Sequence, residues 1–348
     1  MLAELIPSEF FDARSDWLLW LITFGAIPLL VYGADRLVAA AVGLADSLNI
    51  PKVIVGATIV SLGTTAPEAA VSVRAAWTGQ SGLALGNGLG SIICDSGLIF
   101  GMCCLIKPLP LDRFILKRHG WIQFGSVLGL AGLIIVLWLI GGGSPDTVVL
   151  GRWVGVVLVG LLGWYLYQSA RWARKHPEPL LAEPVDVHVK RGQKVLKNLL
   201  TAGVLIFGLV LVVFGSEVLV GSVTVICRRH DVPESVLAGT LVAFGTSLPE
   251  LVTAITSIVK GHPELLVGNI IGADILNILF VIGFSALAKP LQIDAPTFYL
   301  LIPTALIMTG LIRFYAVISG SSFRRWQGIP LLAVYVAYLV LLAGWFGI

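Results

Sequence analysis

Residues 56–73 of the chain read GATIVSLGTTAPEAAVSV, and residues 238–255 read AGTLVAFGTSLPELVTAI, which repeats much of the same sequence. The two stretches align without a gap at an offset of 182 residues (Glu250 minus Glu68), which superimposes the two glutamates. Both glutamates lie inside apolar segments of the kind that span a membrane, where a carboxylate costs at least ~2.5 kcal/mol to insert. Because the chain carries this cost twice in the same local sequence, the repeat predicts that the two carboxylates hold a cation.

The composition is that of a polytopic membrane protein. Of 348 residues, 57% are hydrophobic and 12% are charged, whereas about a quarter of the residues in soluble domains are charged. A helix needs about 20 apolar residues to cross the ~30 Å hydrocarbon core. We therefore expect an all-α fold of ten transmembrane helices, at residues 17–43, 51–77, 83–106, 120–141, 148–171, 198–226, 232–259, 264–288, 296–316 and 327–347.

One long hydrophilic connection, residues 172–197, divides the chain into two halves. The N-terminal half (1–171) holds five spans and the repeat unit 56–101, and the C-terminal half (198–348) holds five spans and the repeat unit 238–283. Because five is odd, the second half enters the membrane with the opposite orientation. The sequence thus predicts two inverted five-helix repeats, a design that places substrate near the middle of the membrane.

The distribution of basic residues predicts the orientation. With residues 172–197 in the cytoplasm, most of the 23 Lys and Arg residues lie in cytoplasmic loops, as the positive-inside rule requires. Both termini are then extracytoplasmic, and we expect the cell (inner) membrane as the location. The basic runs are explained by topology, so we expect lipid and small ions as partners, no nucleic acid, and a monomer.

Histidine and cysteine offer no resident metal centre or cofactor site. None of the five histidines falls within a predicted span, and the four cysteines (Cys94, Cys103, Cys104 and Cys227) lack metal-ligand spacing. We expect buried apolar thiols there. We therefore expect no cofactor, and the only bound species to be the transported ions.

The motif at the centre of each repeat is Gly-Thr-Thr/Ser-x-Pro-Glu. A proline removes one backbone donor and clashes with the carbonyl four residues back, so spans 2 and 7 are predicted to be broken helices. Irregular backbone at membrane depth is tolerated where it lines a polar cavity. The motif supplies carboxylate, hydroxyl and carbonyl oxygens, which suit Ca²⁺ and Na⁺. The alternative is that each proline only kinks its span while the glutamate bonds to a neighbouring helix.

The second part of each repeat adds polar residues. In residues 83–101, Asn87, Ser91 and Asp95 recur every fourth position and share one helical face. The equivalent positions in residues 265–283 are Asn269, Ala273 and Asn277, with Asp274 beside them. Close helix packing explains the glycines Gly86, Gly90, Gly268 and Gly272, but it does not explain the two aspartates. We therefore include Asn87, Asn269, Asp95, Asn277 and Asp274 among the candidate ion ligands.

The pairs GTTAPE/GTSLPE and GNGLGS/GNIIGAD resemble the two alpha repeats of the calcium/cation antiporter superfamily, the sodium/calcium exchangers of prokaryotic type. The resemblance implies a cluster of four ion sites that exchanges several Na⁺ for one Ca²⁺. It implies that Glu68 and Glu250 are the carboxylates shared by Ca²⁺ and Na⁺, with Asp274 as an accessory acid. The oxygen donors that it implies are Thr64, Thr65, Thr246 and Ser247.

The chain departs from the family pattern in its first repeat. Prokaryotic members usually read GSN-x-x-N there, whereas this chain has Ile92 and Asp95 in place of the two asparagines. Potassium-dependent members carry an acid at the position of Asn277. Asp95 is therefore open to two interpretations, an ion ligand or a protonated, hydrogen-bonded acid without ion contact.

The primary hypothesis is antiport of Ca²⁺ against Na⁺ by alternating access, with no enzymatic activity. The alternatives on the same fold are a K⁺-dependent Na⁺/Ca²⁺ exchanger and a Ca²⁺/H⁺ exchanger; a passive channel and an intramembrane protease fit the repeat less well. Outside the motifs, Asp35 and Glu217 occupy equivalent positions in spans 1 and 6. They are open to two interpretations, lining an ion path or fixing these helices to the core. We expect the structural role, with Arg36 as a counter-charge for Asp35.

Overall fold

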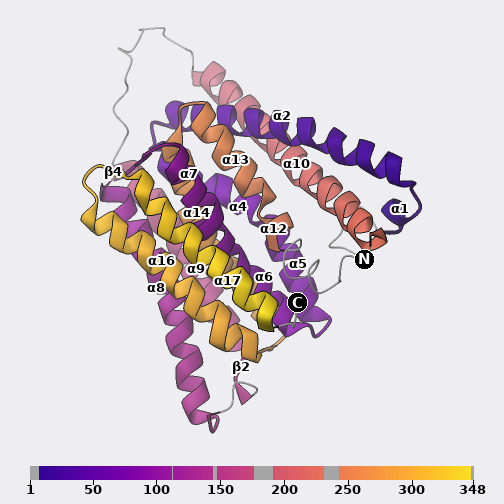
Figure 1. The fold of residues 1–348 in the computed structure, drawn as a ribbon. Coiled ribbons are helices and arrows are strands. Elements are labelled where there is room, and N and C mark those ends of the chain that lie inside the picture. The colour runs from indigo at the N-terminus through magenta and orange to yellow at the C-terminus, as the bar shows by residue number, and fades with distance from the viewer. Residues whose placement is uncertain (1–7, 112, 144–146, 176–190, 231–242, 346–348) are drawn as a thin grey trace.

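The computed structural model describes residues 8–111, 113–143, 147–175, 191–230 and 243–345, which are almost entirely helical (Figure 1). The helices of the first half are α1 (Ser8–Asp12), α2 (Asp16–Leu48), α3 (Lys52–Val55), η1 (Gly56–Val60), α4 (Ser61–Thr64), α5 (Ala66–Trp77), α6 (Ser81–Ile93), η2 (Cys94–Ile99), α7 (Phe100–Ile106), α8 (Arg113–Ile140) and α9 (Arg152–Lys175). Those of the second half are α10 (Arg191–Arg229), α12 (Ala243–Thr246), α13 (Leu248–Val259), α14 (Pro263–Leu276), η5 (Asn277–Ile282), α15 (Gly283–Ala288), η6 (Thr297–Leu301), α16 (Ile302–Ile318), η7 (Arg325–Gln327) and α17 (Gly328–Trp345).

Over the described residues, the helices are consistent with the predicted layout of ten membrane spans. Eight described helices are long and apolar enough to cross a membrane, and the bent pair Lys52–Thr64 and Ala66–Trp77 makes a ninth. The remaining predicted span, 232–259, is described only in its second part, because residues 231–242 lie outside the described residues. Most of the predicted linker between the halves, 172–197, lies outside them as well, so the division into two halves stays a prediction.

Two short antiparallel strand pairs connect the halves at their ends. The pairs are β1 (Leu109–Pro110) with β4 (Ser322–Phe323), and β2 (Val149–Leu150) with β3 (Leu291–Gln292). In each pair one strand comes from the first half and one from the second. Strand β1 follows span 3 just as β3 follows span 8, so the two halves join each other in an equivalent way.

The two spans that carry the second part of each repeat form the centre of the bundle. The apolar window of Pro263–Ala288 is 94% buried and that of Ser81–Ile106 is 78% buried, against 33% for α2 and 28% for Asn198–Ile226 in α10. Helices α2 and α10 lie side by side and run obliquely across one flank of the bundle (Figure 1). A polar side chain on the central spans therefore faces protein, and α2 with α10 forms a peripheral pair.

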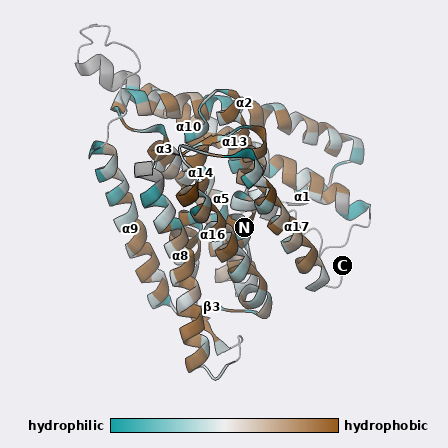
Figure 2. Ribbon diagram, turned by 60° about the vertical axis from the view of Figure 1, so that its left-hand side comes forward, coloured by the Kyte–Doolittle hydropathy of each residue, from teal (hydrophilic) through white to brown (hydrophobic). Residues whose placement is uncertain are grey.

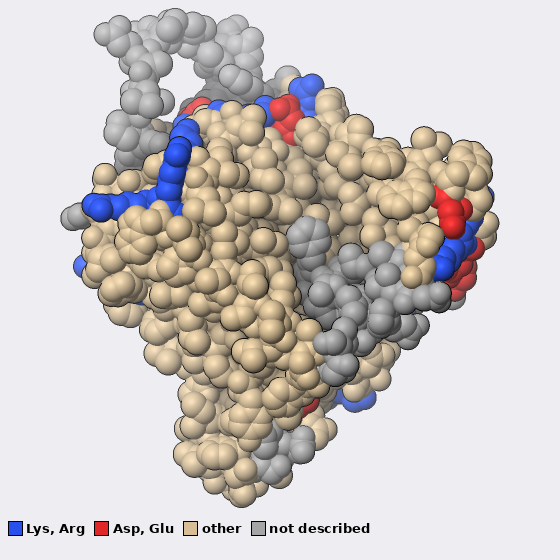
Figure 3. Space-filling view, in the orientation of Figure 1, with Lys and Arg blue, Asp and Glu red and all other residues tan. Residues whose placement is uncertain are grey.

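The surface agrees with a protein that lies within a lipid bilayer. Hydrophobic residues extend along most of each long helix, and hydrophilic residues gather toward the helix ends (Figure 2). On the face drawn in Figure 3, charged residues lie at the margins and leave a broad uncharged area between them. Together with the apolar helices, this distribution identifies an integral, multi-pass membrane protein.

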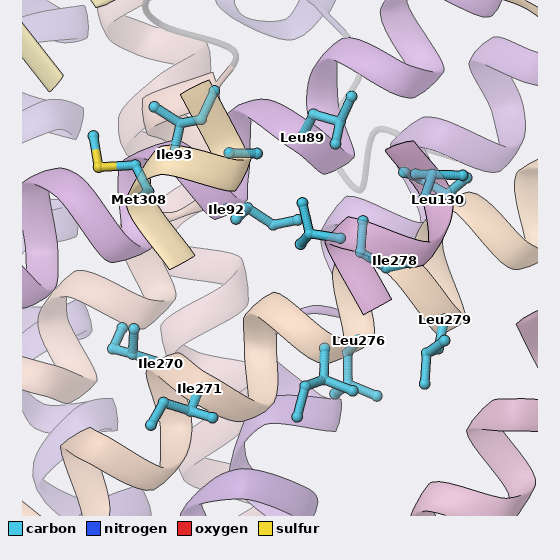
Figure 4. Close-up of a cluster of buried hydrophobic side chains, with 14 of the residues drawn as sticks. Leu89, Ile92, Ile93, Leu130, Ile270, Ile271, Leu276, Ile278, Leu279 and Met308 are labelled. Carbon is cyan, nitrogen blue, oxygen red and sulfur yellow. The ribbon is translucent and has the colours of Figure 1, made fainter. Parts of the chain in front are cut away.

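A large apolar cluster surrounds the central spans. Figure 4 shows part of it, with side chains from α6, α8, α14, η5 and α16 in contact. Ile92, one of the two departures from the family pattern, is fully buried in this cluster. The side chain at this position therefore packs against hydrocarbon groups.

Candidate functional site

Both predicted helix breaks are present at the central motif. Span 2 bends by 44° between α4 and α5, and span 7 is interrupted between α12 and α13. The residues at the two breaks, Thr65 and Ser247, have nearly the same backbone angles, φ −81° and ψ −3° against φ −85° and ψ 4°. Pro67 and Pro249 fall in the first turn of the new helices, where a missing N–H leaves no hydrogen bond unmade. The sequence thus restarts a helix at the same point of each repeat.

Glu68 and Glu250 lie in the first turns of α5 and α13, where the partial positive charge of a helix N-terminus favours a carboxylate. Both side chains are 1% exposed. The two carboxylates interact electrostatically with each other, and Asp95 interacts with both. The hydroxyl of Thr65 donates to Glu250 across the repeat boundary, with 3.5 Å between Oγ1 and Oε1. The mirror-related glutamates therefore converge on one buried region.

The two asparagines that open the second part of each repeat hold the broken helices together. Asn87 Nδ2 donates to the Glu68 carbonyl at 3.1 Å, and its Oδ1 accepts from Thr246 Oγ1 at 3.2 Å. Asn269 Oδ1 accepts from Thr64 Oγ1 at 3.5 Å. Because Asn87 corresponds to Asn269 and Thr246 to Thr64, these are the same contact made twice. Each asparagine crosses from its own repeat to the helix break of the other.

Asp274 has the most complete set of partners among the acids. Its Oδ2 accepts from Ser96 Oγ at 2.6 Å and from Gln123 Nε2 at 2.5 Å. It also interacts electrostatically with Glu250 and Asp95. The four acids Glu68, Glu250, Asp95 and Asp274 thus form one connected group, with contributions from both repeats.

The helices widen where the acids lie. Residues Cys94–Ile99 and Asn277–Ile282 adopt π-helical geometry at nearly equivalent places in the two repeats, and Asp95 and Asn277 lie at the start of these segments. Single π turns inside α-helices occur frequently at functional sites. The extra residue per turn changes the direction in which the following side chains project. The four-residue spacing that places Asn87, Ser91 and Asp95 on one helical face therefore does not continue beyond Asp95.

Many buried oxygens of the four acids and of the repeat segments that carry them have no hydrogen-bond partner among the described residues. They are Glu68 Oε2, Glu250 Oε2, both oxygens of Asp95, Asp274 Oδ1, Asn277 Oδ1, and the hydroxyls of Ser91, Ser247 and Thr253. Buried polar atoms are nearly always paired, so such a concentration of unpaired acceptors fits residues that bind a cation. Within the part of the chain that the structure describes, no three His, Cys, Asp or Glu side chains form a compact metal cluster. The unpaired oxygens belong instead to carboxylates, hydroxyls and an amide.

Ten of the eleven residues predicted from the sequence are linked by hydrogen bonds or electrostatic interactions, and none of these contacts includes Asn277. All eleven are buried except Thr246, which is half-buried; their role as ligands stays a prediction. Sequence reasoning missed three residues: Gln123 and Ser96, which donate to Asp274, and Ser72. The hydroxyl of Ser72 accepts a hydrogen bond from Asn87 Nδ2 at 2.9 Å. A signal for Gln123 was available, because an uncharged amide inside span 4 has no explanation in lipid contact. Ser96 and Ser72 are too common in membrane helices to stand out.

Two expectations about other polar residues were wrong. His119 lies inside a span, since the apolar helix begins at Lys117; its Nδ1 is 3.0 Å from the hydroxyl of Tyr165, which donates to the Ala57 carbonyl. Asp35 is paired with Lys260 at 2.7 Å, whereas Arg36 lies over the ring of Tyr32. The ion pair still fixes α2 to the core, at the end of α13, but the counter-charge comes from another span.

A cavity of about 520 Å³ leads to the site from one end of the bundle. It lies between α5, α10 and the α12–α13 break, and Thr246, Pro67 and Pro249 line it. Glu217 and Arg74 line the same cavity. At the C-terminal end of α13, the Asp35–Lys260 ion pair links Lys260 to the second half of α2.

The family model of the sodium/calcium exchanger protein matches residues 18–170 and 200–344. The chain is 34% identical over 269 residues to the inner membrane protein YrbG of Escherichia coli, covering 76% of this chain and 78% of that protein. It is 29% identical over 354 residues to the sodium/calcium exchanger MaX1 of Methanosarcina acetivorans, covering 93% and 98%. Its fold is similar to that of the sodium-calcium exchanger NCX_Mj, with a TM-score of 0.76, 28% identity, and coverage of 94% and 99%.

Proposed function

Because the chain belongs to the sodium/calcium exchanger family of calcium/cation antiporters, we propose that it exchanges Ca²⁺ for Na⁺ at a carboxylate site in the middle of the membrane. Members of this family are secondary transporters and not enzymes. The observation that carries the proposal is the convergence of Glu68 and Glu250, from mirror-related broken helices, beside Asp95 and Asp274. The assignment of individual ligands is part of the same proposal.

The chemistry of the group favours hard cations. Carboxylate, hydroxyl and amide oxygens are the ligands that Ca²⁺ takes in proteins. Carboxylates that are close together in a region with little water repel one another, and a bound cation relieves this repulsion. One Ca²⁺ or several Na⁺ neutralise a comparable amount of the carboxylate charge. A site that changes access mainly when filled would couple the two ions and prevent a leak.

Access to the site from alternate sides follows from the inverted repeat. The cavity along α10 reaches Thr246, and the predicted topology places its mouth on the extracytoplasmic side. The Asp35–Lys260 pair lies at the end predicted to be cytoplasmic. We propose that α2 and α10, which form a peripheral pair, move relative to the central spans so that the opposite end opens. An inward Na⁺ gradient would then drive Ca²⁺ out of the cytoplasm.

A second candidate follows from Asp95. This acid lies in the same buried group as Glu68, Glu250 and Asp274, and one Ca²⁺ neutralises two of four carboxylates. The remaining charge favours a co-bound monovalent cation, K⁺ or a proton, as in the K⁺-dependent and Ca²⁺/H⁺ alternatives.

We also propose that the protein lies in the cell (inner) membrane with both termini extracytoplasmic, and that it is a monomer.

The experiment is uptake of ⁴⁵Ca²⁺ into proteoliposomes that contain the purified full chain. Outward gradients of Na⁺, K⁺ and H⁺ are imposed one at a time, the Na⁺ gradient is also imposed together with K⁺, and protein-free liposomes serve as the control. The expected result is uptake driven by the Na⁺ gradient. Uptake driven only by H⁺, or only when K⁺ is also present, would replace the Na⁺/Ca²⁺ assignment with the corresponding alternative. Absence of uptake under all three gradients would overturn the proposal.

A further inference from the structure

We propose that Gln123, in α8, belongs to the cation site: it positions Asp274 and offers its own amide oxygen as a neutral ligand. This inference rests on the proposed function, because it concerns the same site. Gln123 is fully buried, and α8 is the fourth span, outside both copies of the repeated motif. The sequence repeat alone therefore gives no reason to place α8 at the ion.

The two oxygens of Asp274 differ in their hydrogen bonding. Oδ2 accepts from both Gln123 Nε2 and Ser96 Oγ, while Oδ1 is buried and has no partner. Hydrogen bonds to an ionised carboxylate are the stronger kind, and donors from two different helices fix the plane of the carboxylate. Asp274 therefore presents one free oxygen in a defined direction, as a ligand held by a supporting hydrogen-bond shell does.

The orientation of the Gln123 amide follows from its partner. The structure directs the NH₂ group of the amide at Asp274 Oδ2, as an ionised carboxylate, which only accepts hydrogen bonds, would require once a cation is bound. The amide oxygen is bonded to the same carbon atom as that nitrogen, so it stays within a few ångströms of it. It too is buried without a hydrogen-bond partner. The Gln123–Asp274 pair thus supplies one charged and one neutral free oxygen, which matches the mixed oxygen sets that bind hard cations.

The repeat itself shows that this arrangement exists on one side of the site only. At the offset of 182, Asp274 corresponds to Ile92, Ser96 to Ile278, and Gln123 to Ala305. All three counterparts are apolar and fully buried in the hydrophobic cluster, and Figure 4 labels Ile92 and Ile278. Each of the three polar residues Asp274, Ser96 and Gln123 thus has an apolar mirror partner. A cation displaced from the Glu68–Glu250 axis is therefore expected to bind on the Asp274 side and not on the mirror side.

The test compares Gln123→Leu with the parent protein and with Ser126→Ala. Ser126 lies one turn along α8, and its hydroxyl donates to the Gln123 carbonyl at 2.9 Å, so it controls for changes to the helix. Ca²⁺ affinity is measured in detergent by isothermal titration and by the Ca²⁺ dependence of thermal unfolding. We expect Gln123→Leu to weaken Ca²⁺ binding about 10–100-fold, the range for loss of a group that supports a metal ligand. Ser126→Ala should leave it unchanged.

A combination with Asp274→Asn separates positioning from general damage. If Gln123 acts only by positioning Asp274, the double variant binds Ca²⁺ no more weakly than Asp274→Asn alone, since interacting residues are not additive. A further loss in the double variant shows that the amide oxygen is a ligand in its own right. Gln123→Met, of similar length and without polar atoms, replaces Leu if the latter does not fold. A lower unfolding temperature with unchanged Ca²⁺ affinity would overturn the inference. If the parent protein itself binds no Ca²⁺, the proposed function fails instead, and the two failures are distinguishable.

Discussion

The two repeats share some of their buried polar residues and differ in others. Near the pseudo-symmetry axis they are alike: each places a glutamate after a helix break, and each sends an asparagine across to the other repeat's threonine. Away from the axis they differ, because Asp274 faces Ser96 and Gln123 whereas the mirror positions are apolar and buried. Asp95 and Asn277 differ in charge at equivalent positions. Under the proposed function, the comparison teaches that the residues shared by both repeats form the centre of the cation site, and that the residues that differ determine how many charges it holds.

The largest expected effect tests the shared centre. Glu68→Gln and Glu250→Gln each remove one charge while keeping size, and because the two residues are equivalent, both should lower Na⁺-driven ⁴⁵Ca²⁺ uptake by more than ~100-fold. Loss of a charge at the centre affects every bound ion in a region where electrostatic interactions are strong. Uptake by proteoliposomes measures the effect. Retained uptake in one variant but not the other would break the equivalence of the two repeats.

The next effect tests the difference in charge between Asp95 and Asn277. We expect Asp95→Asn to weaken Ca²⁺ binding about tenfold, which corresponds to ~1.4 kcal/mol, because one of four carboxylates is lost. The double change Asp95→Asn with Asn277→Asp returns the charge at the mirror position and should recover most of the affinity. Titration of Ca²⁺ in detergent measures both variants. No loss in Asp95→Asn would favour the interpretation of Asp95 as a protonated acid without ion contact.

A smaller effect tests how closely the helices approach in the two repeats. A Cβ on Gly268 would meet the backbone carbonyl of Val53, whereas one on its counterpart Gly86 would meet only Leu301 Cδ2 at 3.9 Å. Gly268→Ala should therefore cost about 1–3 kcal/mol through overpacking. Gly86→Ala is the matched control and should change little. The midpoint of thermal unfolding in detergent distinguishes them, and equal midpoints would contradict the asymmetric packing.

The smallest effect concerns the ion pair between the halves. Lys260→Met removes the partner of Asp35, but both side chains are partly exposed, at 27% and 45%. We expect a loss of stability below ~1 kcal/mol, as for other exposed pairs, measured by thermal unfolding in detergent. Arg36→Met, which removes the contact with Tyr32, is the control. A larger loss in Arg36→Met would restore Arg36 as the counter-charge of Asp35.

Much of the fold could be predicted because membrane spans are local features. A run of about 20 apolar residues must form a helix to satisfy its own backbone, so the positions of α2, α8, α9, α16 and α17 follow from composition. The helix breaks at Thr65 and Ser247 were also predictable, since proline acts on its own backbone. The length of α8 was less so, because polar residues such as His119 continue an apolar helix when neighbouring spans cover them.

The candidate site could be predicted where the same residue type occurs at equivalent positions of both repeats. Glu68 and Glu250 were identified from the repeat, and so were Asn87 and Asn269. Gln123 was not, because it occurs once and its partner Asp274 is 151 residues away in sequence. The pairing of Asp35 was assigned to the adjacent Arg36 for a related reason: proximity in sequence is a poor guide to which helix supplies a counter-charge.

The sequence by itself determined that the chain crosses the membrane many times, that it repeats one unit, and that each unit carries a buried acid after a helix break. These follow from transfer free energies and backbone chemistry, which act on a residue and its immediate neighbours. Only the tertiary structure decided that the acids of both units meet, that Asp274 is held from α8, and that its mirror side is apolar. Electrostatic interaction and hydrogen bonding depend on distance in space, and only the packing of the helices sets that distance.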